Sequence, residues 1–430
     1  MSRFVAAFIA ALIPLAGISG CSGNSGNTSS TSSAGSSGTV KSTGGTLKVW
    51  MPPFGSEGVS DKSFWTEQIQ PLAKSSGVSL DVEIIPWSNY EEKYLTAITA
   101  GNGPDVGYMY MEMMSDYIKM GALEPLDSYF TSAERSNYIY ADKGVIQGKF
   151  YALPIVVGNV SVLFCNMSIL NKSGLTTPPK TWDDLAAYTQ KIKKDSPDKY
   201  PFLQEWGDPT IGGLNNAYYP YLWQAGGSLF NEAGTALTLN TPEALQAAQF
   251  VYDLKFKYKV LPGAVTSMSV ADVKKSMVSG KTAMALLGTS VASDLDKAGI
   301  KWDFVTSLTK KQGGTFCAAD SLVMIKSGTQ KELAAKAMKL MTSPAVMEKF
   351  HQQVYSAPPI SKNEKYFDNA KFKKMYQDDT ASFRIITPVA GSDKIYDNLY
   401  KNLQLMMLGQ AKPEQALKET ENYANSVLTK

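Results

Sequence analysis

The chain has 430 residues, of which 44% are hydrophobic and 19% charged, and its formal net charge is +3. One hydrophobic core rarely organises a chain of this length, so at least two folding units are expected. No basic segment alternates with aromatic residues, and this argues against a nucleic acid as partner. Beyond the N-terminus no second long apolar run occurs, so we expect the body of the protein to be soluble.

The N-terminus has the pattern of an export signal. Arg3 precedes an apolar run over residues 4–18 that is short for a membrane-spanning helix. The run ends in Ile18-Ser19-Gly20-Cys21, which resembles the recognition sequence of the lipoprotein signal peptidase. We therefore predict a signal peptide over residues 1–20, an acylated Cys21, and anchoring to the extracytoplasmic face of the cell membrane. The alternatives are an ordinary secretory signal or a chance cysteine.

A low-complexity segment follows the predicted anchor. Residues 22–45 are almost entirely Ser, Gly, Thr and Asn. Such a segment buries too little apolar surface to offset its chain entropy, so residues 21–45 are expected to be the acylated cysteine and a flexible tether. A spacer of about 24 residues reaches on the order of 25–30 Å, which suits a globular body held near a membrane.

The body opens with alternating strands and helices, an order that indicates a parallel sheet flanked by helices. Ser88 and Glu91 have the spacing of a capping box, which would open the second helix, and Gly101 would end it. The other predicted elements of this region are a strand over residues 46–51, a helix over 64–75, and strands over 80–84 and 105–110.

The rest of the chain is mainly helical by pattern, with one aromatic-rich interruption. Thr181 with Asp184, and Thr241 before Pro242, are typical helix starts. Residues 200–231 form a loop-rich stretch dense in Gly, Trp and Tyr. Further helices are predicted over residues 269–279, 332–341, 344–353 and 413–428, and a buried strand over 283–287.

Motifs for catalysis and metal binding are scarce. His351 is the single histidine, so a Ser-His-Asp triad and a histidine zinc site lack their usual residues. We expect a helix-capping or surface role for it. Residues 280–282 (GKT) lack the first glycine and the preceding strand of a phosphate-binding loop. No cofactor and no metal are therefore expected. A carboxylate pair for glycoside hydrolysis stays open, with the candidates Glu57, Asp105, Glu112, Glu205 and Asp320.

Two cysteines remain besides Cys21. Cys165 and Cys317 would form one disulfide in an oxidising compartment, or would pack as two small buried side chains. Their spacing does not distinguish these alternatives.

Several short motifs, in a fixed order, resemble one protein family. Residues 92–106 (EKYLTAITAGNGPDV) lead from a helix through a glycine turn into a strand, and residues 121–127 (GALEPLD) form a second turn. This order resembles the extracellular solute-binding proteins of carbohydrate ABC importers, the group that contains the maltose-binding proteins. The resemblance spans nearly the whole body. Further matching segments are residues 148–154 (GKFYALP), 163–166 (LFCN), 179–185 (PKTWDDL), 226–227 (GG), 280–284 (GKTAM) and 343–348 (SPAVME).

The resemblance implies an α/β fold of the periplasmic-binding-protein type, with two lobes, crossing strands that act as a hinge, and a central ligand cleft. The first lobe would comprise residues 46–158 and 322–355, and the second lobe residues 159–321 and 356–430. Closure of the lobes on a carbohydrate would be sensed by ABC permease subunits that work with a cytoplasmic ATPase. The implied protein is a monomer that is not an enzyme.

A carbohydrate site needs aromatic rings for the sugar C–H faces and charged or amide groups for the hydroxyls. Residues 200–231 supply this mixture, including the pair Asn215-Asn216. The resemblance further places Glu112 and Glu205 at sugar-binding carboxylates, and Asn159 at a crossover Glu of the maltose group. The predicted ligand-binding residues are Trp50, Glu57, Tyr110, Glu112, Asn159, Glu205, Trp206, Trp223, Asp320 and Arg384.

Two other classes of function stay open. One is an anchored glycoside hydrolase or lyase, and the other is a solute-binding protein for a polyamine, a metal ion or a phosphorylated polyol. Polyamine receptors also use Trp and carboxylates, whereas the scarcity of His and Arg argues against transition metals and phosphate. Among carbohydrates, a smaller or atypical sugar is favoured over a long maltodextrin, because Thr289-Ser290 replace the aromatic residue that the family often has after Gly288.

Overall fold

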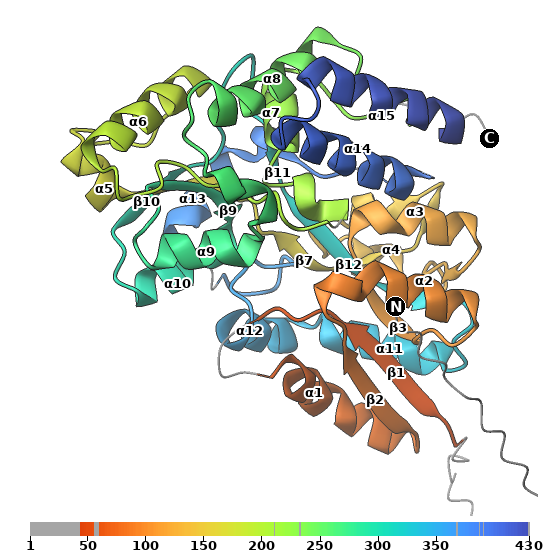
Figure 1. The fold of residues 1–430 in the computed structure, drawn as a ribbon. Helices are drawn as coiled ribbons and strands as arrows, with labels where there is room; N and C mark the ends of the chain where they lie inside the picture. The colour runs from red at the N-terminus through yellow and green to blue at the C-terminus, as the bar shows by residue number, and fades with distance from the viewer. Residues whose placement is uncertain are drawn as a thin grey trace, which may run out of the picture. The chain divides into compact units, whose positions relative to one another are not determined.

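The structure is a computed structural model that describes residues 44–55, 60–209, 211–231, 234–366, 369–386, 388–389 and 391–428. Cys21, the predicted signal peptide and nearly all of the predicted tether lie outside these ranges, as does Glu57. The described residues belong to one compact unit, shown in Figure 1. None of the helices in these ranges combines the length and the apolar character that crossing a membrane requires.

The first lobe is built on a mixed sheet. Its strands are, in spatial order, β2 (Ser79–Ile84), β1 (Thr46–Met51), β3 (Val106–Met109), β12 (Ala318–Ile325) and β4 (Leu123–Glu124), and β7 (Leu153–Gly158) also pairs with β12. Strand β1 is parallel to β2 and β3, which confirms the predicted parallel start. Strand β12 returns from late in the chain and runs antiparallel to β3, β4 and β7.

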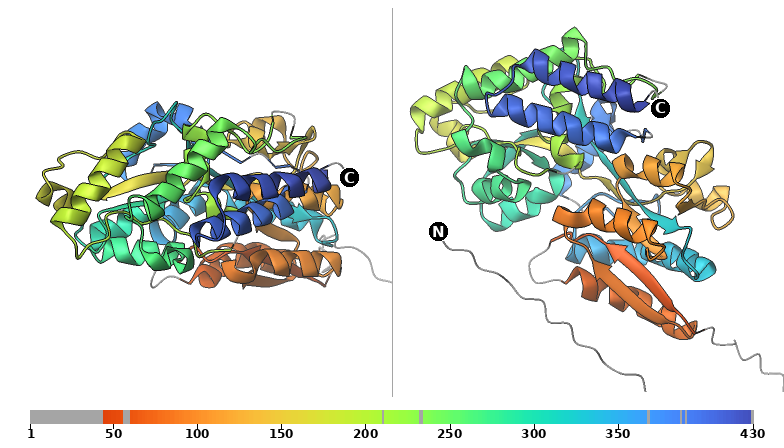
Figure 2. Two further views of the ribbon diagram at one scale, coloured as in Figure 1. Left: turned by 45° about the horizontal axis from the view of Figure 1, so that its top comes forward. Right: turned by 45° about the vertical axis from the view of Figure 1, so that its right-hand side comes forward.

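The helices of the first lobe bury apolar residues in its core, apart from the short α4 (Ser132–Arg135), which has no buried residue. The others are α1 (Asp61–Ser75), α2 (Tyr90–Thr99), α3 (Met111–Lys119), α11 (Lys331–Met341) and α12 (Pro344–Gln353). Because α1 and α2 lead in opposite directions across the sheet, right-handed crossovers place them on opposite faces (Figures 1 and 2). In the core, the rings of Trp65 and Phe350 lie 5.1 Å apart.

The predicted capping box at Ser88 is wrong. Helix α2 begins at Tyr90, its N-cap is Asn89, and no side chain caps it. Ser88 instead lies within the short turn η1 (Trp87–Asn89). The Trp87 indole donates to the carbonyl oxygen of Pro53 at 3.2 Å, and its ring packs on Tyr90. These contacts favour a 3-10 turn at this point over a side-chain cap.

The second lobe contains an antiparallel sheet in the order β10 (Trp302–Val305), β8 (Ser161–Asn166) and β9 (Met284–Gly288). Its C-terminal helices α14 (Ser392–Met407) and α15 (Pro413–Leu428) lie side by side (Figures 1 and 2). The remaining helices of this lobe are α5 (Met167–Lys172), α6 (Trp182–Asp195), α7 (Tyr219–Gln224), α8 (Pro242–Phe256), α9 (Val270–Val278), α10 (Ala292–Lys297) and α13 (Ala370–Asp378).

The helix starts that local sequence specifies in this lobe are confirmed. Thr181 caps α6 through a full capping box with Asp184. Thr241 accepts from the backbone of Ala244 at the start of α8, whose first residue is a proline. The predicted helices over residues 344–353 and 413–428 have the bounds of α12 and α15. These starts depend on neighbouring residues alone, which explains why sequence predicts them.

The chain passes between the two sheets where β7 leads into β8. Gly158 and Asn159 both have positive φ there, 81° and 38°. Gly158 also pairs with Ala318, the first residue of β12, and a Cβ atom at Gly158 would lie 2.3 Å from the ring of Pro358. Three segments that are distant in sequence therefore meet at one point, and any side chain at position 158 would push them apart.

Short elements complete the description. The strands β5 (Val145–Ile146) and β6 (Lys149–Phe150) pair with each other, as do β11 (Thr315–Phe316) and β13 (Phe383–Arg384). The 3-10 turns besides η1 are η2 (Ala141–Gly144), η3 (Ile211–Leu214), η4 (Gly263–Ser267), η5 (Thr289–Val291) and η6 (Thr380–Ser382).

Three side chains whose roles the sequence left open are buried. Cys165 and Cys317 are free thiols, one in β8 and one just before β12, so they pack as small apolar groups. His351 lies near the end of α12 with its side chain fully enclosed, so a surface role for it is wrong. Its Nδ1 atom lies 3.1 Å from the carbonyl oxygen of Tyr355, and its Nε2 atom 3.0 Å from Glu364.

Candidate functional site

Glu112 lies in the first turn of α3 and is the centre of a polar group that both lobes build. Glu112 is only 3% exposed, and carboxylates that are buried so deeply usually have a partner. Asn215, from the second lobe, donates to it through Nδ2 at 3.4 Å. Burial raises the pKa of Glu112 to about 7, the Asn215 hydrogen bond lowers it, and nearby Glu91 raises it further.

Asp320 extends this group from β12. The hydroxyl of Tyr108, on the neighbouring strand β3, donates to its Oδ2 atom at 2.5 Å. Burial raises the pKa of Asp320 to about 8, the negative charge of Glu112 adds to the rise, and the Tyr108 hydrogen bond opposes it. Glu112 and Asp320 are therefore electrostatic neighbours that disfavour each other's ionisation.

Glu205 continues the group into the second lobe. Its Oε1 atom accepts from Nδ2 of Asn216 at 3.0 Å, and Asn216 in turn accepts from the hydroxyl of Ser161 at the start of β8. Burial raises the pKa of Glu205 to about 8, the Asn216 hydrogen bond lowers it, and Asp208 raises it. Because Asn215 and Asn216 are adjacent in the chain, they link Glu112 to Glu205. The resulting set, which we call the carboxyl site, consists of Tyr108, Glu112, Glu205, Asn215, Asn216 and Asp320.

Of the buried polar atoms near this site that have no hydrogen-bond partner among the described residues, two lie close to Glu112. They are the hydroxyl of Tyr219 and the amide oxygen Oδ1 of Asn215. Tyr219 is fully buried and feels the charge of Glu112, and the Asn215 amide is the one that donates to Glu112. Buried polar atoms are normally paired, so these two mark a place where an added molecule would find hydrogen-bond partners.

An aromatic group borders the carboxyl site on the first lobe. Tyr110, at the N-cap of α3, donates its hydroxyl to Glu91. Its ring lies near those of Tyr90 and Trp87, with centroids 6.5 and 6.4 Å away. Trp87 is 40% exposed, an unusual state for so large an apolar ring. The site thus has an exposed aromatic face beside its carboxyl groups.

Three predicted ligand contacts are core residues in this structure. Trp50 packs edge-on against Tyr94 at 5.2 Å in the first lobe. Trp206 is fully buried in the core of the second lobe, and Trp223 packs on Tyr219 in the same core. The aromatic density of residues 200–231 therefore serves mainly to fill the second lobe.

Asn159 lies at the crossing between the lobes, apart from the carboxyl site. Its Oδ1 atom accepts from the backbone of Ser290 at 3.3 Å. A Cβ atom at Gly288 would lie 2.5 Å from this oxygen, so the side chain is closely packed on β9. Its contacts are those of a residue that fixes the crossing.

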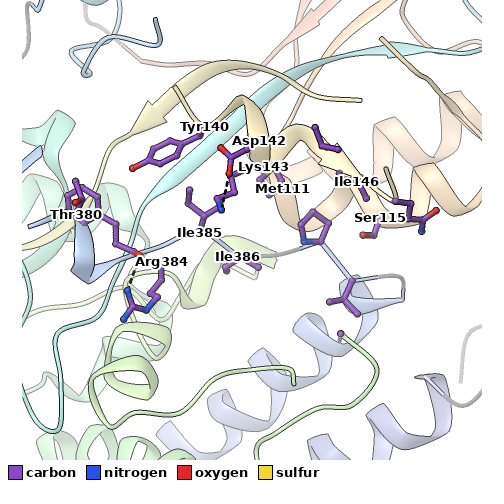
Figure 3. Close-up of a pocket in the computed structure, with 16 residues that line it drawn as sticks. Met111, Ser115, Tyr140, Asp142, Lys143, Ile146, Thr380, Arg384, Ile385 and Ile386 are labelled. Atoms are coloured by element: carbon purple, nitrogen blue, oxygen red, sulfur yellow. Dashed lines mark hydrogen bonds and ion pairs between the residues drawn. The ribbon is translucent and has the colours of Figure 1, made fainter. Parts of the chain in front are cut away.

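Arg384 lines a different space, a cavity of about 760 Å³ shown in Figure 3. Its guanidinium donates to the carbonyl oxygens of Ala381 and Phe383 at 2.7 and 3.0 Å. Lys143, on the opposite wall, pairs with Asp142 at 3.2 Å. The lining of the cavity includes Met111 and Ser115 of α3, the helix that carries Glu112, but no residue of the carboxyl site. The other lining residues are Tyr140, Val145, Ile146, Gln147, Gly234, Thr380, Phe383, Ile385, Ile386, Pro388 and Val389.

The structure thus brings Glu112, Glu205 and Asp320 together, with Tyr110 at their edge. Tyr108 and Trp87 were not predicted. Tyr108 stands two residues before Tyr110, and the two-residue period of a strand puts both on one face, which is the signal that identifies it. Trp87 has no comparable local signal, because its exposure depends on the turn that Pro53 fixes. Among the described residues, no group of three or more His, Cys, Asp and Glu side chains is placed to hold a metal ion.

A family model for "Bacterial extracellular solute-binding protein" matches residues 56–348, well over half of the chain. The chain belongs to this family. Among curated relatives, a "putative binding protein" of Brucella abortus is 28% identical over 376 residues, covering 83% of this chain and 88% of the relative. A "maltotriose-binding protein" of Pyrococcus abyssi is 26% identical over 182 residues, covering 41% of this chain and 37% of the relative.

Solved structures share the two-lobed fold of this solute-binding protein. An ABC transporter solute-binding protein of Thermotoga lettingae, bound with α-D-tagatose, superposes with a TM-score of 0.77 at 24% identity, covering 89% of this chain and 99% of that one. The maltose-bound MalE3 of T. maritima gives a TM-score of 0.77 at 20% identity, covering 89% and 99%. The predicted fold class is therefore confirmed, and the family's members are binding proteins.

Proposed function

We propose that this solute-binding protein captures a carbohydrate between its lobes and delivers it to an ABC importer. The observation that carries the proposal is the carboxyl site, where Glu112 of the first lobe accepts a hydrogen bond from Asn215 of the second, next to Asp320 near the start of β12. Buried carboxylates and amides bind hydroxyl groups strongly. The Tyr219 hydroxyl and the Asn215 Oδ1 atom have no hydrogen-bond partner among the described residues, so a ligand hydroxyl could bond to them.

The aromatic border suits the apolar side of a sugar. Pyranose C–H groups pack on indole and phenol rings, and Trp87 presents such a ring next to Tyr108 and Tyr110. A relative named as a maltotriose-binding protein, and solved structures with bound tagatose or maltose, support a saccharide as ligand.

The lobes and the hinge follow the same proposal. We assign residues 46–158 and 322–355 to the first lobe, and residues 159–321 and 356–430 to the second. Asn215 reaches Glu112 across this division, so ligand binding and lobe closure would be linked. The protein acts as a monomer, and permease subunits with a cytoplasmic ATPase would read the closed form.

The proposal places the protein outside the cytoplasm, held by an acylated Cys21 and a tether. The family description as extracellular supports the location. Metabolic labelling with palmitate tests the anchor, since Cys21→Ser is expected to abolish labelling and to release the protein from the membrane. Labelling of the variant would exclude Cys21 as the acylation site.

A thermal-shift screen over mono- and oligosaccharides tests the function, because a ligand that binds the folded state raises the melting temperature. A saccharide at about 100 times its Kd is expected to stabilise by about 2.7 kcal/mol. Saccharides that bind are then incubated with the protein and recovered. Unchanged sugar supports capture, whereas cleaved sugar would identify an anchored hydrolase. No shift with any saccharide would refute the carbohydrate assignment.

A further inference from the structure

The carboxyl site contains acidic groups without a cation. The electrostatic and hydrogen-bonding neighbours that set the pKa of Glu112, Asp320 and Glu205 are acids, amides, a phenol and backbone groups, and none is a lysine or an arginine. Isolated buried carboxylates are costly, so each must take up a proton or meet a positive charge. An ordinary neutral sugar would supply no such charge.

The chain has no spare arginine to fill this role. Of its three arginines, Arg3 lies outside the described residues, Arg135 pairs with Asp127 at 3.0 Å, and Arg384 binds carbonyl oxygens in the other cavity. The internal residues outside the described ranges are Ser56, Glu57, Gly58, Val59, Thr210, Glu232, Ala233, Phe367, Asp368, Thr387 and Ala390. None of them is basic, so no internal gap in the description hides a positive side chain.

We propose that the captured sugar carries a protonated amine, and that Glu112 and Asp320 are the anionic partners of this ammonium group. The inference rests on the proposed function and specifies the substrate class of the same site. An ammonium group offers three donors, and the carboxyl oxygens together with the unpaired Oδ1 of Asn215 are acceptors. The hydroxyl of Tyr219 remains available to a sugar hydroxyl, which distinguishes an amino sugar from a simple amine.

The proposal predicts an exchange of protons on binding. Without ligand, Glu112 and Asp320 hold protons near neutral pH because burial raises their pKa to about 7 and about 8. An ammonium beside them favours the ionised form, so the carboxyl protons pass to the buffer as the amine binds with its own proton. A neutral sugar leaves these protons in place.

Calorimetry on the full chain tests this with matched ligands. The panel pairs each amino sugar with its neutral and N-acetylated counterparts. The amino monosaccharides are glucosamine, galactosamine and mannosamine. Among β-1,4 disaccharides, chitobiose is the amino form, cellobiose the neutral form and diacetylchitobiose the N-acetylated form, and spermidine serves as a simple amine. At about pH 6, where a free amine is protonated, the amino form of the binding skeleton is expected to bind about 10- to 100-fold more tightly than both counterparts. Repeating the titration in buffers of different ionisation enthalpy should show proton release for the amino form alone.

Two variants complete the test. Glu112→Gln replaces a proposed anionic partner by a neutral amide of similar shape, so the ratio of amino-form affinity to neutral-form affinity should fall by about 10-fold. Glu134→Gln is the control, because Glu134 is an exposed carboxylate that pairs with Lys339 and does not belong to the carboxyl site; it should leave both affinities unchanged. Equal or tighter binding of the neutral sugar would overturn the inference and leave the proposed function intact. Binding of spermidine without any saccharide, or of nothing in the panel and the saccharide screen, would overturn both.

Discussion

Two clusters of charged side chains, the Arg384 cavity and the carboxyl site, differ in how many of their charges and polar atoms have partners within the protein. In the Arg384 cavity every charge has a protein partner, since Arg384 binds two carbonyl oxygens and Lys143 pairs with Asp142. In the carboxyl site the charges are alike, and burial and mutual repulsion raise the pKa of Asp320 to about 8. The Arg384 cavity has a volume of about 760 Å³, yet the unmet hydrogen bonds lie at the carboxyl site.

The difference teaches that volume alone does not locate a ligand. A cavity whose polar groups are paired gains little from a polar guest, whereas buried acceptors without donors gain a full hydrogen bond from one. Glu112, which links both lobes through Asn215, is therefore the residue on which ligand binding should depend most. Arg384, which sequence analysis placed with it, should matter much less.

The largest expected effect is on affinity. Glu112→Ala removes a buried carboxyl and leaves the amide of Asn215 without its partner, so affinity for the ligand should fall by about 100-fold or more. Arg384→Ala, the control in the other group, should change affinity by less than about threefold. Isothermal titration measures the affinity of both variants. A larger loss of affinity in Arg384→Ala than in Glu112→Ala would contradict the assignment of the ligand to the carboxyl site.

The next effect concerns stability and pH. The pKa of Glu112 is raised from 4.5 to about 7, so the protonated side chain suits the fold and stability is lost as pH rises from about 4.5 through 7. Glu112→Gln removes this loss, and at about pH 8 the unliganded variant should be more stable than wild type by roughly 1–3 kcal/mol. Below about pH 4.5 the two should converge.

Glu134 should change the stability of the protein with pH in the opposite direction. Its hydrogen bond to Lys339 lowers its pKa from 4.5 to about 2, so its contribution is present above about pH 4.5 and is lost as pH falls toward 2. Glu134→Gln should therefore destabilise slightly at neutral pH, because the pair is exposed. Denaturant unfolding across pH measures both variants, and a stabilised Glu134→Gln with a destabilised Glu112→Gln would contradict the account.

A smaller effect separates binding from folding at two neighbouring tyrosines. The hydroxyl of Tyr219 has no partner among the described residues, so Tyr219→Phe should lower ligand affinity by about 3- to 10-fold with little loss of stability. The hydroxyl of Tyr221 donates to Gln204 at 3.1 Å, so Tyr221→Phe should cost about 1 kcal/mol of stability and leave affinity nearly unchanged. Thermal unfolding and titration of both proteins distinguish these roles.

The smallest effect is expected at Trp87. Trp87→Ala removes an exposed ring that is proposed to stack on the sugar, and affinity should fall by about 2- to 5-fold. Tyr200→Ala is a suitable control because Tyr200 is equally exposed, at 40%, but does not border the site. An equal response of the two variants would remove Trp87 from the site.

Sequence predicts the local parts of this fold well. The strand over residues 46–51 and the helices over 344–353 and 413–428 have the predicted bounds, because period, proline and caps act over a few residues. The cap at Ser88 failed because a contact between Trp87 and Pro53, 34 residues away, decides the turn.

The carboxyl site was predictable only in part. Resemblance to a family placed Glu112 and Glu205 among the candidates, and Asp320 was predicted as well. Their meeting depends on contacts such as that between Asn215 and Glu112, which are 103 residues apart, and that between Tyr108 and Asp320, 212 residues apart. The tryptophans are ambiguous in the sequence for the converse reason, since a ring that suits a sugar equally suits a core, and only tertiary packing separates the buried Trp206 from the exposed Trp87.

A crystal structure of the protein with a saccharide from the screen tests the central claim most directly. The account predicts sugar density between the lobes, with ligand atoms within hydrogen-bond distance of Glu112, Asp320 and the Oδ1 atom of Asn215. Density instead in the cavity beside Arg384 and Lys143, with Glu112 and Asp320 untouched, would contradict it.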